Sequence, residues 1–159
     1  VKRAGIRLCC GGILGLGESP AQRIELAMTL RELDVDIVSL NFLHPIPGTP
    51  LQGQKSLPPL RILSIIALFR LMLPTREIKI TGGRERNLRD LQSMIFAAGA
   101  DGIIIGNYLT TPGRSPEEDL QMLRDLGLSV RKSGQVSSPG GRSARRGTTR
   151  PASRKPSKT

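Results

Sequence analysis

The sequence predicts an α/β fold of four βα units that form the C-terminal half of a TIM-type (β/α)8 barrel, followed by a disordered basic tail. Strand and helix signals alternate four times over residues 1–130, and repeated βα units form parallel sheets with crossover helices. The predicted strands also carry polar side chains on one face, as the inner face of a barrel does near its site. A whole barrel needs about 250 residues, so we expect the other half to precede Val1.

The predicted strands are residues 6–14, 36–43, 77–81 and 102–105. Successive side chains of a strand point to opposite faces, so apolar residues such as Val38 share one face that can pack under helices. The opposite face carries a thiol, an amide, an ammonium and a hydroxyl, on Cys9, Asn41, Lys79 and Thr81. A strand covered by helices on both faces would be apolar on both, so we expect this polar face to line a site.

The predicted helices are residues 20–33, 57–73, 87–98 and 115–127. Ser19 is expected to cap the first helix, with Pro20 at its first helical position. Pro74 ends the second helix and Gly99 ends the third. The fourth begins with acidic residues in its first turn, where they favour the helix dipole.

Charge is concentrated in the last 29 residues. The chain has a net charge of +11, and residues 131–159 contain nine Lys or Arg and no acidic residue. This segment is rich in Gly, Ser and Pro and has few apolar residues, so we expect a disordered tail over 129–159 after a folded domain over 1–128. Contact with nucleic acid or an acidic membrane is an alternative to a solvated extension, but no aromatic residues are interleaved for base stacking.

The composition also indicates the cellular compartment of the protein. The two cysteines, with no secretory signal and no run long enough to span a bilayer, predict a cytoplasmic protein without a membrane segment. The first five residues read like the end of a helix with a glycine stop, so we expect the chain to be a fragment of a longer protein.

Each motif, taken alone, is weak evidence for a functional site. The run GGILGLGE does not match the phosphate-binding or dinucleotide-binding glycine patterns, and such a turn is often only structural. His44, between Leu43 and Pro45, is expected to be a loop residue rather than a ligand. An isolated Cys9 would usually be a small buried apolar residue, and Thr110 and Thr111 could simply form a turn.

The motifs taken together resemble the C-terminal half of biotin synthase, a family of S-adenosylmethionine (SAM) radical enzymes. The segments that carry the resemblance are GIRLCCGGILGLGES, VSLNFLHPIPGTPL, IKITGGRE and GNYLTTPGRSPEEDL. The resemblance covers residues 1–128, and residues from about 48 to 128 resemble the region shared by biotin and thiamin synthesis enzymes. It implies conversion of dethiobiotin to biotin by radical sulfur insertion.

The resemblance assigns cofactor-binding residues. Four positions match the family motif G-x-I-x-G-x-x-E that binds SAM: Gly11, Ile13, Gly15 and Glu18. Cys9 matches a ligand of an auxiliary 2Fe-2S cluster that is thought to supply the inserted sulfur, whereas Cys10 matches a small residue facing the helices. Lys79 falls where well-known members have an arginine ligand, and it could bind the cluster only as a deprotonated amine.

The resemblance also assigns substrate contacts. Asn41 matches the asparagine that binds the ureido ring of dethiobiotin through its paired donor and acceptor, and Thr110 and Thr111 match the pair that holds the substrate carboxylate. The Cys-x3-Cys-x2-Cys loop of the 4Fe-4S cluster is missing here, so we expect the isolated chain to be inactive. The intact enzyme is expected to be a homodimer that uses SAM and both clusters.

Two alternatives remain open at this stage. One is a related radical SAM enzyme of the hydrogenase-maturation or pyrrolysine type, which Asn41 and the threonine pair disfavour. The other is a catalytically dead binding protein that uses its half-barrel and basic tail for an interaction.

Overall fold

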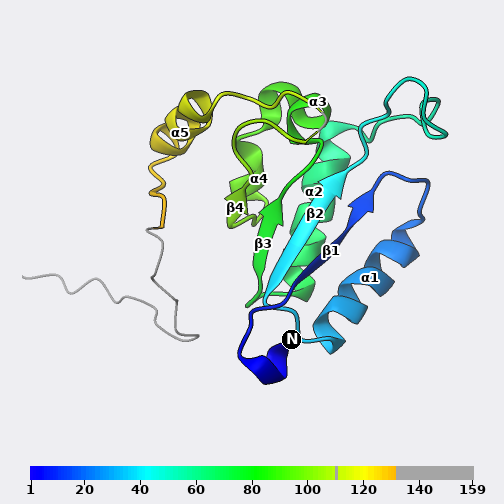
Figure 1. Ribbon diagram of the computed structural model, residues 1–159, viewed down its shortest axis with the longest axis vertical. Coiled ribbons are helices and arrows are strands. Elements are labelled where there is room, and N and C mark those ends of the chain that lie inside the picture. Colours follow the sequence, from blue (N-terminus) through cyan, green and yellow to red (C-terminus); the bar gives the residue numbers. More distant parts are fainter. Residues whose placement is uncertain (110, 132–159) are drawn as a thin grey trace, which may run out of the picture.

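The computed structural model describes residues 1–109 and 111–131, so Thr110 and the predicted tail beyond residue 131 lie outside the described residues. A single parallel sheet forms the centre of the molecule, with its strands in chain order (Figure 1). The strands are β1 (Cys9–Leu14), β2 (Ile37–Phe42), β3 (Glu77–Ile80) and β4 (Gly102–Ile103).

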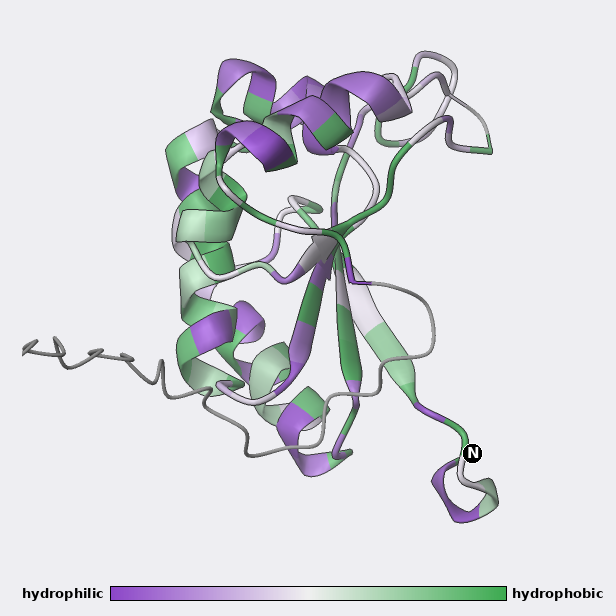
Figure 2. Cartoon of the chain, turned by 90° about the vertical axis from the view of Figure 1, so that its left-hand side faces the viewer, coloured by the Kyte–Doolittle hydropathy of each residue, from purple (hydrophilic) through white to green (hydrophobic). Residues whose placement is uncertain are grey.

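The α-helices lie on one side of the sheet and at the carboxyl ends of its strands, and no α-helix of the described residues covers the other side, called here the open face (Figure 2). The α-helices are α1 (Pro20–Glu32), α2 (Pro59–Met72), α3 (Arg84–Leu88), α4 (Met94–Ala97) and α5 (Pro116–Asp125), and the 3-10 helices are η1 (Lys2–Ala4) and η2 (Arg89–Leu91). The alternation of parallel strands and helices confirms an α/β fold consistent with a partial barrel.

Two serines cap their helices, and one of them, Ser19, is a cap that the sequence predicts. Ser19 accepts a hydrogen bond from the backbone of Gln22, and the Gln22 side chain accepts one from the Ser19 backbone. Ser115 and Glu118 form the same reciprocal pair at the start of α5. Each capping box satisfies two backbone donors that a helix start otherwise leaves unpaired.

The apolar face of the sheet is buried and the polar face is not. Val38, Leu40, Ile78 and Ile80 are each 0% exposed and pack in the core under the helices. The residues that alternate with them are only half-buried. The face assignment made from sequence is therefore confirmed for β2 and β3.

The predicted third helix is wrong as a single element. Residues 87–98 are divided among α3, η2 and α4, and helix formation begins earlier, at Arg84. The break lies at Arg89, whose φ of 50° is incompatible with a continuing right-handed helix. The early start follows from Gly83, which precedes α3 in a left-handed conformation.

All four strands are shorter than predicted, and β1 and β4 differ by more than one residue at one end. β1 begins at Cys9 instead of residue 6, because Leu8 donates its N–H to the Asp36 carboxylate at 2.7 Å before the regular register begins. β4 ends at Ile103 instead of residue 105, since only its first two residues pair with β3.

Gly11 and Gly83 lie where two backbones meet too closely for any side chain. A Cβ on Gly11 would lie 1.8 Å from the carbonyl oxygen of Ser39 on β2, and one on Gly83 would lie 1.9 Å from the carbonyl oxygen of Phe42. Real Cβ atoms do not approach backbone so closely. Part of the glycine pattern therefore serves the packing of the sheet itself.

Within residues 1–109 and 111–131, β1 and β4 each pair with a single strand, which leaves one edge of each open. Closed barrels leave no such edges. No helix in these ranges is both long enough and apolar enough to cross a bilayer.

Candidate active site

The thiol of Cys9 lies on the open face of the sheet. Its Sγ is 3.2 Å from the hydroxyl of Ser39 on the neighbouring strand. Cys9 is exposed, whereas Cys10 is half-buried and packs against the core. The structure therefore separates the adjacent cysteines onto opposite faces, as predicted from the alternation of strand residues.

Lys79 lies on the same face but is engaged in an ion pair. Its Nζ is 3.1 Å from the Glu77 carboxylate, which also binds Arg7 at 2.8 Å. Burial acts to raise the pKa of Glu77, but the hydrogen bonds and charges of Arg7 and Lys79 outweigh it and lower the pKa. Glu77 therefore stays ionised and holds Lys79 as a paired cation.

The residues on this face fit one position of an iron–sulfur cluster. Cys9 offers a soft, accessible sulfur donor of the kind such clusters prefer. The Nζ of Lys79 is engaged by the Glu77 carboxylate in this arrangement. The described part of the chain holds no group of three or more His, Cys, Asp or Glu side chains suited to a metal ion. Within the described residues, this face therefore presents one thiol, that of Cys9.

A cavity of about 320 Å³ lies at the carboxyl ends of the strands, nearer the top of the sheet in Figure 1. It brings together three of the residues selected from sequence: Ile13, Asn41 and Thr111. Ile13 and Asn41 are direct partners in the β1–β2 register. Cys9 and Lys79 lie further toward the amino ends of the strands and do not line this cavity.

Asn41 is held in one orientation by its neighbours. Its Oδ1 accepts hydrogen bonds from the Thr81 hydroxyl at 2.7 Å and from the Gly82 backbone N–H at 2.8 Å. Its Nδ2 donates to the Gly12 carbonyl at 3.4 Å. The amide is half-buried and lines the cavity.

A buried polar network supports the wall of this cavity, and sequence reasoning missed it. Arg84 and Asp119 are both 0% exposed and form a two-pronged ion pair, with contacts of 3.0 and 2.6 Å. Arg84 also bonds Glu85, which accepts a hydrogen bond from the Tyr108 hydroxyl at 2.9 Å. From sequence, Arg84 and Glu85 stand out only as part of the segment IKITGGRE. Nothing in that segment indicates their contacts with Asp119 and Tyr108.

Tyr108 connects two elements of the site. Its hydroxyl lies 3.1 Å from the carbonyl oxygen of Thr81. Tyr108 itself lies on the loop that leads to Thr111, and both residues line the cavity. Burial and the neighbouring Glu85 carboxylate raise the pKa of Tyr108 to about 12. The phenol therefore stays protonated and keeps its donor at neutral pH.

Glu18 shapes the glycine-rich turn after β1. Its carboxylate accepts hydrogen bonds from the backbone N–H groups of Gly15 at 2.9 Å and Leu16 at 2.8 Å, and from Arg23 at 2.8 Å. Burial acts to raise the pKa of Glu18, but these donors outweigh it and lower the pKa. Glu18 therefore fixes the backbone of the motif in which Ile13 lies.

We expect Glu18→Gln to destabilise the chain by about 1–2 kcal/mol at pH 7, because the amide offers one neutral acceptor in place of an anion. A lowered pKa in the folded state contributes stability above the ordinary value of 4.5, and that contribution is lost as the pH falls through the folded pKa. Urea unfolding between pH 7 and pH 3 should therefore show a shallower acid-induced loss in the variant. The exposed Glu25→Gln is the control, and equal curves for the two variants would contradict this role.

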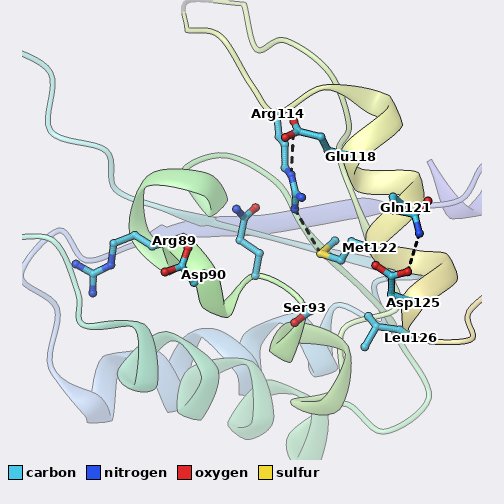
Figure 3. A pocket seen from close by; sticks show the side chains of 10 residues that line it. Arg89, Asp90, Ser93, Arg114, Glu118, Gln121, Met122, Asp125 and Leu126 are labelled. Atoms are coloured by element: carbon cyan, nitrogen blue, oxygen red, sulfur yellow. Dashed lines mark hydrogen bonds and ion pairs between the residues drawn. The ribbon is translucent and has the colours of Figure 1, made fainter.

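A larger hollow of about 660 Å³ lies between η2 and α5 (Figure 3). Arg114 reaches across its rim to Glu118 at 3.7 Å and to the Met122 sulfur at 3.8 Å. None of the described residues selected from sequence as site residues lines it. The candidate active site is therefore the smaller cavity at the ends of the strands.

Parallel βα units with polar groups on the open face, near the carboxyl ends of the strands, define a class: enzymes built on a (β/α) barrel, here as a partial barrel. The fold is similar to that in the crystal structure of methylornithine synthase, with a TM-score of 0.65 and 25% sequence identity. The likeness covers 82% of this chain and 42% of that chain.

The sequence comparisons show the particular family. Residues 39–129 match the Biotin and Thiamin Synthesis associated domain. The biotin synthase of Geobacter sulfurreducens is 66% identical over 131 residues, and that of Geobacter metallireducens is 68% identical over 129 residues. The matches cover 82% and 81% of this chain but only 40% and 39% of those proteins. The chain belongs to the biotin synthase family and spans about 40% of the length of the curated relatives it matches.

These values confirm the resemblance on which the sequence interpretation rests. An identity of 66–68% to biotin synthases, against 25% to methylornithine synthase, favours biotin synthase over the other radical-enzyme families considered from sequence.

Proposed function

We propose that this chain forms one wall of the active site of a biotin synthase, an enzyme that converts dethiobiotin to biotin by inserting sulfur with radical SAM chemistry. The observation that carries the proposal is the cavity that joins Ile13, Asn41 and Thr111, in a chain 66% identical to a biotin synthase. A cavity at the carboxyl ends of parallel strands is where barrel enzymes place their substrates.

The residues of the cavity fit the two ends of dethiobiotin. Asn41 would bind the ureido ring, and Thr111, together with Thr110 outside the described residues, would hold the carboxylate. Ile13 is 52% exposed and would offer an apolar surface to the adenosyl group of SAM. Gly11, Gly15 and Glu18 would act by shaping the turn beside it, since Glu18 bonds the backbone of Gly15.

Cys9 would be a ligand of the 2Fe-2S cluster, with the remaining ligands outside the described residues. When bound, such a cluster would supply the sulfur for insertion, while a 4Fe-4S cluster would cleave SAM. Lys79, paired with Glu77, would act as a cation beside the cluster rather than as its ligand. We further propose that the intact enzyme is a cytoplasmic homodimer with no nucleic-acid role.

The proposal is tested with a chimera in which this chain replaces the matching 131 residues of the Geobacter sulfurreducens enzyme. The purified chimera, supplied with iron, sulfide, SAM and a reductant, is expected to form biotin from dethiobiotin. Asn41→Ala should raise KM for dethiobiotin by about tenfold to a hundredfold, the value of one or two hydrogen bonds. Gln121→Ala, in the other hollow, is the control.

A folded chimera that carries its clusters and forms no biotin would overturn the proposed function. It would favour the alternative of a catalytically dead binding protein. Unchanged KM in Asn41→Ala would overturn the placement of the ureido ring in this cavity.

A further inference from the structure

We propose that Thr81 is a positioning residue: its hydroxyl, with the N–H of Gly82, fixes the Asn41 amide so that Asn41 offers only an N–H donor and selects a carbonyl oxygen on the substrate. The inference rests on the proposed function, because it concerns how the same site reads the ureido ring. It differs from the sequence interpretation, in which Asn41 uses both a donor and an acceptor.

The orientation of the Asn41 amide is fixed by the backbone N–H of Gly82. The backbone N–H of Gly82 can only donate, and it lies 2.8 Å from the atom assigned as Oδ1. The oxygen of the amide must therefore face Gly82, and the nitrogen must face away from it. A Cβ on Gly82 would lie 3.0 Å from Oδ1, so this close approach depends on glycine.

The Thr81 hydroxyl is the second hydrogen-bond donor to Oδ1 of Asn41. Its hydroxyl lies 2.7 Å from Oδ1, closer than the 3.1 Å to the Leu40 carbonyl, so its single proton is best used on Asn41. A carbonyl oxygen has two lone pairs, and both are then occupied by the protein. Asn41 is left with no acceptor for a substrate.

The nitrogen of the amide remains available. It carries two protons, and within the described residues only one of them has an acceptor, the Gly12 carbonyl at 3.4 Å. The other proton is free to meet the cavity that Asn41 lines. The chemical partner that fits it is a hydrogen-bond acceptor such as the carbonyl oxygen of a cyclic urea.

The position of Thr81 makes this arrangement rigid. The side chain is 8% exposed, and its backbone is tied to β2 by a hydrogen bond of 2.9 Å to the Leu40 carbonyl. The hydroxyl of Tyr108, on the loop that carries Thr111, lies 3.1 Å from the carbonyl oxygen of Thr81. Thr81 therefore links the groups proposed for the two ends of the substrate, in surroundings where hydrogen bonds are stronger than in water.

The test compares two ligands on the chimera by equilibrium binding and by KM. One is dethiobiotin, and the other is its 2-imino analogue, in which a protonated nitrogen replaces the ring carbonyl oxygen and presents donors instead of an acceptor. Thr81→Val keeps the side-chain shape but frees one lone pair of Oδ1, so this oxygen, still held by Gly82, can accept a hydrogen bond from a ligand donor. We expect the preference for dethiobiotin over the analogue to fall about tenfold, the value of one hydrogen bond.

Three controls make the result specific. Thr81→Ser retains the hydroxyl and should restore the preference, and Thr29→Val, on the exposed surface of α1, should leave it unchanged. kcat of Thr81→Val should change less than KM, because the residue acts on binding. An unchanged preference in a folded Thr81→Val chimera, or failure of Thr81→Ser to restore it, would overturn the positioning role.

A third variant separates this inference from the proposed function. Asn41→Asp replaces the donor by an acceptor and should weaken dethiobiotin binding if Asn41 contacts the substrate at all. No effect of Asn41→Asp would overturn the proposed contact itself. An effect of Asn41→Asp without one of Thr81→Val would overturn only the role of Thr81.

Discussion

Replacing Asp119 by alanine is expected to destabilise the chain by about 3–5 kcal/mol, because it removes the buried two-pronged partner of Arg84 and leaves the guanidinium only its single contact with Glu85 as an ion pair. Both side chains are 0% exposed, and the pair joins the start of α3 to the first turn of α5. Water cannot reach Arg84 to replace the lost partner. Urea unfolding followed by circular dichroism should show a large fall in midpoint, or a chain already unfolded without urea.

Two variants show whether the unpaired charge is the cause. Arg84→Met combined with Asp119→Leu removes both charges and fills similar volume, so it should recover most of the lost stability. Lys2→Ala breaks an ion pair with the exposed Asp34 and should cost at most about 1 kcal/mol. If Asp119→Ala is as mild as Lys2→Ala, the pair does not hold the wall of the site.

Cys9→Ala is expected to abolish biotin formation by the chimera and to remove the visible absorption of the 2Fe-2S cluster. Cys9 is the thiol that the open face of the sheet presents, and an alanine offers no donor in its place. Absorption spectra and iron content of the reconstituted protein measure the effect. The 4Fe-4S cluster should survive, because no residue of this chain is proposed to bind it.

Cys10→Ala is the matched control, one residue away. Its side chain packs against the core on the opposite face, so the variant should keep the cluster and lose only some stability. Equal losses of cluster absorption in the two variants would contradict the assignment of faces.

The strands and their faces could be predicted because alternation along a strand is a local property of the sequence. Val38 and Leu40 are buried and Asn41 lines the cavity, as the pattern indicates. The first and last helix starts were equally predictable, since Ser19 and Ser115 carry their capping boxes within four residues.

The division of the third helix could not be predicted, because the left-handed conformation of Arg89 has no signal in a residue type that rarely adopts it. The Arg84–Asp119 pair was missed for a different reason. Its members are 35 residues apart, on α3 and α5, and no periodicity along the chain links them. The family motif marked Arg84 without giving its partner.

The orientation of the Asn41 amide is likewise a tertiary property. It depends on Thr81 and Gly82, which lie about 40 residues further along the chain and meet Asn41 only through the β2–β3 pairing. A resemblance can assign a substrate contact to Asn41, but only the structure shows which of its atoms is free.

X-ray diffraction from crystals of the reconstituted chimera with dethiobiotin, recorded at the iron absorption edge, would locate the metal relative to this sheet. We predict an iron peak bonded to the Cys9 sulfur on the open face, with the ring of dethiobiotin beside Asn41 on the same side. An iron site on the helical side near Cys10, or dethiobiotin bound away from Asn41, would contradict the assignment of this face as the wall of the active site.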